Sequence, residues 1–117
     1  MGHGERDGAD RGRIVVAQGE LWLMEPPNGK RRPVLIVTRD VAIPVLNNVL
    51  VAPITSTIRA IPTNIAVGPA DGIDHASVAN FDSLATVPKS VLTRRLGAID
   101  PLRHAEICLA LDAVADC

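Results

Sequence analysis

The chain has 117 residues, of which 47% are hydrophobic, and Trp22 and Phe81 are its two aromatic side chains. This length predicts one domain, and the apolar content excludes a disordered protein. The scarcity of rings excludes strong binding of single-stranded nucleic acid by base stacking. The net charge of −1 argues against non-specific nucleic-acid binding, so a basic site must be local.

The N-terminal segment and the cysteines limit location and cofactors. Residues 1–13 (MGHGERDGADRGR) hold almost nothing apolar, and they predict a flexible N-terminal tail before a single domain over residues 14–117. We find no signal peptide and no membrane-spanning run, so we expect a cytoplasmic protein without membrane contact. Cys108 and Cys117 show no Cys/His ligand spacing, so we expect no metal and no other cofactor.

The first half of the domain predicts three strands. Residues 17–24 place Leu21 and Leu23 on one face and Trp22 and Met24 on the other. After a turn at 26–29, residues 31–39 are apolar at every central position, so both faces of that strand should be covered. Residues 40–47 form a loop, and residues 48–54 form the third strand. Pro53 lacks an amide donor and belongs at a strand end, bulge or edge.

The second half predicts shorter elements. They are strands over 64–67, 76–81 and 94–99, an extended segment over 84–87 and a single helical turn over 87–92. Asp100 is a favoured N-cap and Pro101 a favoured first helical residue, so a helix should run to about Ala115. Its apolar residues lie on most sides, which indicates a subunit interface. Together these elements predict a small β-barrel with a C-terminal helix.

Positive charge gathers in two runs. Lys30, Arg31, Arg32 and Arg39 have no acid between them, and Lys89, Arg94 and Arg95 follow later. Such runs are either solvated loop charges or the wall of a groove for a phosphate backbone. His3, His75 and His104 are not paired by any motif, which disfavours a nuclease that uses two histidines.

Two segments are candidates for chemistry. In GKRRPV (29–34), Pro33 holds Arg32 in extended geometry, and a guanidinium there can bind a phosphate with two hydrogen bonds. In APITST (52–57), Thr55, Ser56 and Thr57 place three hydroxyls after a buried strand. Arg-Pro steps and Thr/Ser turns also arise without function, so neither segment is specific by itself.

The ordered set of motifs resembles the MazF/PemK toxin family. The set is GELW, GKRRPVLIVT, VAPIT, IPTNI, NFDSLATVPK and RLG, and it covers roughly residues 18–114. The resemblance implies an SH3-like barrel of the CcdB/MazF/Kid type, a homodimer, and the toxin component of a type II toxin–antitoxin system. It further implies a sequence-selective endoribonuclease that needs no metal. Attack by the RNA's own 2′-hydroxyl would leave a 2′,3′-cyclic phosphate and a 5′-hydroxyl, and so inhibit translation and growth.

The resemblance also assigns residues. Arg32 matches the family's Arg-Pro arginine and would bind the scissile phosphate, as an acid or a charge stabiliser. Thr55 matches the Pro-Ile-Thr threonine and would position that phosphate or the attacking hydroxyl. The residues that would bind RNA or support the site are Lys30, Arg31, Ser56, Asn80 and Asp82. Asp82 matches an aspartate that takes part in the PemK branch, but Asn80 replaces that branch's arginine, so the proton acceptor stays unassigned and Asp82 is equally well a turn residue.

Partners and substrates follow from the resemblance. The loop from Glu25 to Arg31 is short, so we expect an open groove that admits a folded tRNA or rRNA loop as well as single-stranded mRNA. A cognate antitoxin would lay a disordered, acidic tail over the basic segment at Lys30–Arg32. The alternatives are a CcdB-like gyrase poison, disfavoured by a C-terminus without aromatic residues, and an RNA-binding barrel without catalysis.

Overall fold

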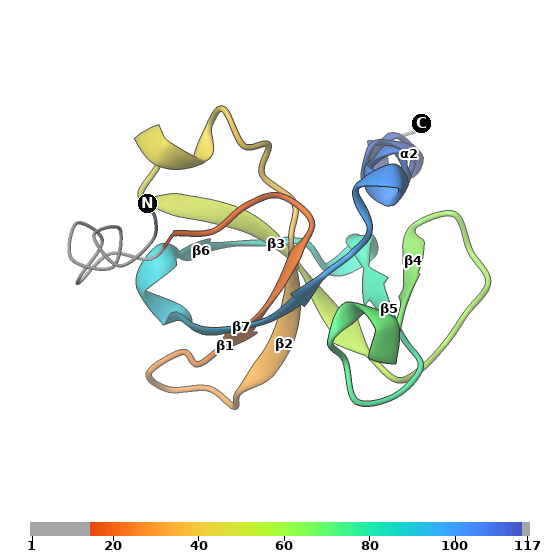
Figure 1. The fold of residues 1–117 in the computed structure, drawn as a ribbon, viewed down its shortest axis with the longest axis horizontal. Coiled ribbons are helices and arrows are strands. Elements are labelled where there is room, and N and C mark those ends of the chain that lie inside the picture. Colours follow the sequence, from red (N-terminus) through yellow and green to blue (C-terminus); the bar gives the residue numbers. More distant parts are fainter. Residues whose placement is uncertain (1–14, 116–117) are drawn as a thin grey trace.

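The computed structural model describes residues 15–115, so the predicted tail over residues 1–13 lies outside the described part. Within it, seven strands precede one α-helix (Figure 1). The strands are β1 (Glu20–Met24), β2 (Arg32–Ile36), β3 (Asn48–Thr55), β4 (Asn64–Val67), β5 (Ser77–Asn80), β6 (Ala85–Pro88) and β7 (Leu92–Ala98). The helix is α2 (His104–Ala115). The predicted mainly β fold with a C-terminal helix is confirmed.

The long strand β3 organises the sheet, whose order is β4-β5-β3-β2-β1-β7. The first half of β3 pairs with β6, from Asn48↔Pro88 to Val51↔Ala85, whereas Ile54 and Thr55 pair with β5. Pro53 lies between these two ladders, so its missing amide donor costs neither of them a hydrogen bond. Figure 1 shows β3 running from the body that contains β2 and β6 toward β4 and β5.

Strand β2 is covered on both faces, as predicted. Leu35 and Val37 belong to one buried cluster, whereas Val34 and Ile36 belong to another. This alternation follows from the two-residue period of a strand. Trp22 joins the cluster of Val34, and Leu21 joins that of Leu35, so β1 also separates its side chains as expected.

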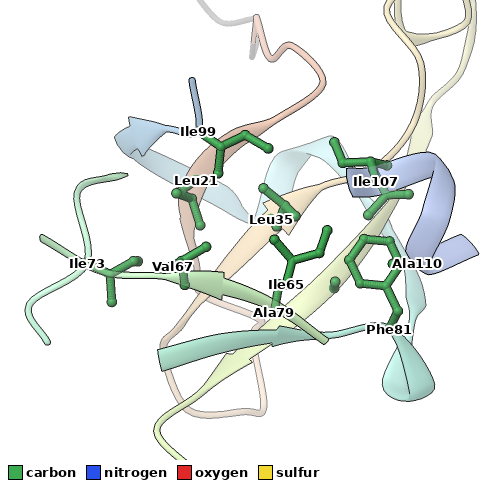
Figure 2. Close-up of a cluster of buried hydrophobic side chains, with 12 residues drawn as sticks. Leu21, Leu35, Ile65, Val67, Ile73, Ala79, Phe81, Ile99, Ile107 and Ala110 are labelled. Atoms are coloured by element: carbon green, nitrogen blue, oxygen red, sulfur yellow. The ribbon is translucent and has the colours of Figure 1, made fainter. Parts of the chain in front are cut away.

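The C-terminal helix closes the cluster that contains Leu35. Figure 2 shows Phe81, which begins the 3-10 turn η3 (Phe81–Ser83), gathered with Ile107 and Ala110 of α2. The side chain of Asp100 accepts a hydrogen bond from the Leu102 amide (2.9 Å), which confirms the predicted cap. The helical part begins as a 3-10 turn, η5 (Pro101–Arg103).

Strands β1, β2 and β5 are shorter than predicted, β5 by one residue at each end. Strand β1 starts at Glu20 because Gly19 has a φ of 86°, which breaks the extended chain. Strand β2 ends at Ile36. Beyond it, side chains bind the backbone: the Thr38 hydroxyl accepts from the Leu50 amide (2.7 Å), and the Asp40 carboxylate accepts from the Gln18 amide (2.6 Å).

Candidate active site

Arg32, at the start of β2, lines three adjoining clefts. The central cleft, about 340 Å³, is formed mainly by the end of β3, the loop between β3 and β4, and the turn after β5. The flanking cleft, about 670 Å³, lies against β7 and the segment before β5, and the third cleft, about 340 Å³, lies under the β1–β2 loop. The side chain of Arg32 is exposed, so a ligand that spans these clefts must pass it.

The central cleft brings four of the predicted residues together: Arg32, Thr55, Asn80 and Asp82. The register explains this. Val34 pairs with Pro53 across β2 and β3, and extending that antiparallel register by two residues places Arg32 opposite Thr55. Strand β5 pairs with the end of β3 through Ile54↔Ala79 and Thr55↔Val78. The same register places Asn80 opposite Pro53, and Asp82 follows two residues later at this cleft.

Asp82 is held in place from two sides. Its backbone amide donates to the Asn80 side chain (3.0 Å), and its carboxylate oxygen Oδ2 accepts from the Thr63 hydroxyl (2.7 Å). Its second carboxylate oxygen has no hydrogen bond within residues 15–115, and the residue is exposed. The Asp82 carboxylate therefore retains an acceptor that can take a proton or a hydrogen bond in the cleft.

The other predicted residues lie around this centre. Arg31 and Ser56 line the flanking cleft with Arg32, and Lys30 lines the third cleft. Thr55 is half-buried, and its hydroxyl accepts from the Thr57 amide (3.2 Å), which leaves the hydroxyl proton able to donate to a ligand. All seven predicted side chains thus lie on one continuous surface.

Most cations of this surface form no ion pair within residues 15–115; Arg95, in the flanking cleft, is the exception. Lys30, Arg31, Arg32, Arg59 and Arg94 line the clefts, and none of them forms an ion pair with another residue of the described part. In contrast, Arg95 is held by Glu20 (2.7 Å) and Arg103 by Glu106 (2.8 Å). Unpaired cations along a groove fit the phosphates of a nucleic acid.

The pKa shifts lie elsewhere. Hydrogen bonding and charge attraction in the Arg103–Glu106 pair raise the pKa of Arg103 and lower that of Glu106. Neither residue lines the three clefts. The pair fastens η5 and α2 to the sheet, since Arg103 also donates to the Ala66 carbonyl (2.6 Å).

Sequence reasoning missed several residues of the clefts. Arg59 and Asn64 line the central cleft, and Asp74 and His75 line the flanking cleft. His75 is exposed, as expected for a surface histidine, but its place beside Arg32 and Arg94 depends on chain crossings that no local motif reveals. Arg94 was visible as part of a basic run, although nothing local tied it to Arg32.

Metal and membrane features are absent from the part of the chain that the structure describes. Residues 15–115 contain no group of three or more His, Cys, Asp or Glu side chains placed to hold a metal ion. None of the helices that these residues form, α2 included, is long and apolar enough to cross a membrane.

Comparisons with known proteins place these features in a family. A family model described as "PemK-like, MazF-like toxin of type II toxin-antitoxin system" matches residues 11–115. The chain is 42% identical over 104 residues to the protein named "Probable endoribonuclease MazF5" of Mycobacterium tuberculosis, which spans 88% of this chain and 95% of that relative.

Solved structures of toxins from the same family have the same fold as this chain. Mycobacterium tuberculosis toxin MazF-mt6 superimposes with a TM-score of 0.75 at 34% identity, covering 83% of this chain and 96% of that one. A mycobacterial endoribonuclease solved with its cognate antitoxin gives a TM-score of 0.74 at 29% identity, covering 86% of this chain and 95% of that one.

Proposed function

Because the chain belongs to the PemK-like, MazF-like toxins of type II toxin–antitoxin systems, we propose that the three clefts around Arg32 form the active site of an endoribonuclease. One observation carries the assignment: Arg32, Thr55 and Asp82 meet in the open central cleft. A guanidinium, a hydroxyl and a carboxylate at one place supply a phosphate ligand, a positioning group and a proton acceptor.

The reaction is an internal transfer of the phosphodiester. The 2′-oxygen of the RNA attacks the neighbouring phosphorus, and the bond between that phosphorus and the 5′-oxygen of the next nucleotide breaks. The products are a 2′,3′-cyclic phosphate and a 5′-hydroxyl. Arg32 binds the non-bridging oxygens and offsets the charge that grows on them. The Asp82 carboxylate takes the 2′-hydroxyl proton, and Thr55 orients the phosphate. Water in the open cleft protonates the departing 5′-oxygen.

The substrate is RNA that presents unpaired nucleotides. Bases can be read only when they are not stacked in a helix. The β1–β2 loop spans only residues 25–31, and its tip is exposed from Pro27 onward, so little chain overhangs the clefts. We therefore propose that loops of tRNA or rRNA enter as readily as unstructured mRNA.

The test is cleavage of total cellular RNA, purified tRNA and unstructured mRNA in EDTA, with sequencing of the 5′-hydroxyl ends. We expect cuts that survive EDTA and disappear in Arg32→Ala and Thr55→Ala. Arg32 is exposed and forms no ion pair with another described residue, so its removal should leave the unfolding midpoint unchanged. Full activity in both variants refutes the site, and binding without cleavage by the wild type supports the non-catalytic barrel. Intact tRNA beside cut mRNA refutes the open-loop substrate.

A second copy of the chain is the partner that α2 fits. Leu102 and Leu109 are 90% and 66% exposed, and their spacing of seven residues puts them on one side of the helical segment, away from the buried Ile107 and Ala110. Exposed apolar side chains that share one face are typical of an interface. We expect a homodimer by light scattering and a monomer in Leu109→Glu. A dimer that survives this substitution excludes the α2 face as the interface.

The unpaired cations also suit an antitoxin. A disordered acidic segment laid over Lys30, Arg31 and Arg32 would be attracted to the charges that bind RNA. Inhibition and catalysis would then share residues. We expect Arg31→Ala to weaken both antitoxin binding and RNA binding, measured by titration calorimetry at two salt concentrations. Weakening of only one of them contradicts a shared surface.

A further inference from the structure

The flanking cleft contains one acid among its cations. Arg31, Arg32, Arg94 and Arg95 line it, and Asp74 is the only carboxylate among its lining residues. Asp74 is exposed and forms no hydrogen bond or ion pair within residues 15–115. A free carboxylate in a basic cleft weakens phosphate binding, so its presence there points to a contact other than a phosphate.

The segment that carries Asp74 is rigid. Its preceding turn, η2 (Pro69–Asp71), is fastened by the Asp71 carboxylate, which accepts from the Gly68 amide (2.9 Å) and lies 3.6 Å from Arg103. On the other side, the buried Ser77 hydroxyl donates to the His75 carbonyl (3.0 Å). Asp74 and His75 are thus presented from a segment fixed at both ends, as selective recognition requires.

A contact between two glycines brings this segment against β7. A Cβ added to Gly72 would lie 2.2 Å from the Leu96 carbonyl oxygen, and one added to Gly97 would lie 2.1 Å from the Asp71 carbonyl oxygen. Only residues without a side chain permit this approach. Asp74 lies two residues after Gly72, and Arg94 lies three residues before Gly97. The contact between the glycines therefore brings Asp74 and Arg94 to the same cleft.

Strand β7 is also irregular at this point. Successive side chains of a regular strand face opposite sides, yet Arg94 and Arg95 both line the flanking cleft. The register against β1 skips Leu96 and then Thr93, so a bulge lies on each side of the arginine pair. Bulges re-aim side chains and are frequent next to active sites.

We propose that the flanking cleft binds a guanine of the RNA next to the scissile phosphate, with Asp74 and Arg94 reading its edges. This rests on the proposed ribonuclease function, since it takes Arg32 as the ligand of that phosphate. Guanine presents two adjacent donors, N1–H and the 2-amino group, which match the two oxygens of a carboxylate. It also presents two adjacent acceptors, O6 and N7, which match a guanidinium.

His75 supplies the platform for this base. Both aromatic residues are buried, Trp22 at 8% exposure and Phe81 at 0%, so neither can stack on a ligand. The imidazole of His75 is the one aromatic ring among the lining residues of the three clefts. Histidine rings stack on unpaired bases in RNA-binding proteins, and Leu23, Ile73 and Leu96 add an apolar floor.

The experiment combines mapping of 5′-hydroxyl ends with kinetics on a short RNA that contains the mapped site. We expect a guanine within two nucleotides of the cut. Replacing it by inosine, which lacks the 2-amino group, should lower kcat/KM in the wild type but not in Asp74→Ala. Asp74→Ala should relax the preference for guanine roughly 5- to 150-fold, as expected for 1–3 kcal/mol of base discrimination. Asp112→Asn, which removes an exposed acid of α2, is the control.

Two further variants separate base reading from other roles. Arg94→Ala should relax the preference at the same position, whereas Arg39→Ala, an exposed cation outside the clefts, should not. His75→Ala should raise KM for all sequences without changing the preferred one, because stacking tolerates any base. If the wild type does not cut RNA, the proposed function fails. If it cuts at sites without a neighbouring guanine, or if Asp74→Ala keeps the wild-type preference, only the guanine proposal fails.

Discussion

Asp82 offers the sharpest test of the chemistry, because the substitution Asp82→Asn changes its charge and little else. An asparagine oxygen can still accept from the Thr63 hydroxyl, which donates to Asp82 at 2.7 Å. The contact with the Asn80 side chain uses the backbone amide of residue 82 and also persists. The exposed position makes any change in stability small.

The size of the effect follows from the role. A positioned general base typically contributes 10²- to 10⁴-fold, roughly 3–5.5 kcal/mol of transition-state stabilisation. We therefore expect kcat of Asp82→Asn to fall by that factor while RNA binding is retained. Thr63→Val removes only the hydrogen bond that orients the carboxylate. Because water replaces that bond at an exposed site, the loss should be about 1 kcal/mol, roughly five-fold in kcat.

The assay is single-turnover cleavage of a fluorescent RNA, which separates the chemical step from RNA binding and product release. Asp112→Asn, remote from the clefts, controls for net charge. A rate in Asp82→Asn within three-fold of the wild type, beside an inactive Arg32→Ala, refutes the assignment and places the proton acceptor elsewhere.

Three further outcomes concern the scaffold. Gly97→Ala should destabilise the protein by about 1–3 kcal/mol, the usual cost of overpacking, because its Cβ would lie 2.1 Å from the Asp71 carbonyl oxygen; chemical denaturation measures this, and an unchanged midpoint contradicts the close contact. Glu106→Gln should lower the free energy of unfolding at pH 7 by less than about 1 kcal/mol, since the ion pair with Arg103 is partly exposed. The pKa of Glu106 is lowered in the fold, so this difference should be present above about pH 4.5 and vanish as the pH falls further, and a constant difference down to pH 2 argues against the pair. Leu35→Ala, at a fully buried position, should cost about 2–5 kcal/mol, and a loss below 1 kcal/mol by thermal unfolding contradicts the described core.

Local rules were sufficient for most of the fold. Alternation of apolar residues predicted that Leu21 and Trp22 face different clusters, and Asp100 with Pro101 predicted the helix start. The strand ends were less predictable, because they depend on distant partners. Strand β2 ends where Thr38 turns to bind the Leu50 amide, twelve residues away, and no local pattern contains that contact.

Site residues could be predicted only where a local sequence pattern pointed to them. Pro33 fixes the backbone of Arg32, and the Thr-Ser-Thr run follows a buried strand, so those positions stood out from the sequence. Asp74 and His75 did not, since their place beside Arg94 depends on the contact between Gly72 and Gly97. Isolated glycines in loops are common, and nothing local shows that two of them touch.

The distribution of ion pairs explains how a chain with a net charge of −1 can have an RNA groove. Glu20 neutralises Arg95, which lines the flanking cleft, and Glu106 neutralises Arg103, which lies outside the three clefts. The five cations that line the clefts without an ion pair in the described part keep their full charge toward a ligand. Each phosphate neutralised on a single strand contributes about 0.7 to the salt slope of log K. RNA affinity should therefore fall steeply with salt despite the net charge of −1, with a slope of up to about 3.5 if all five cations contact phosphates. A slope below 1, measured by fluorescence anisotropy on the Asp82→Asn variant, which should cleave slowly but retain RNA binding, would mean that most of these cations do not contact phosphates.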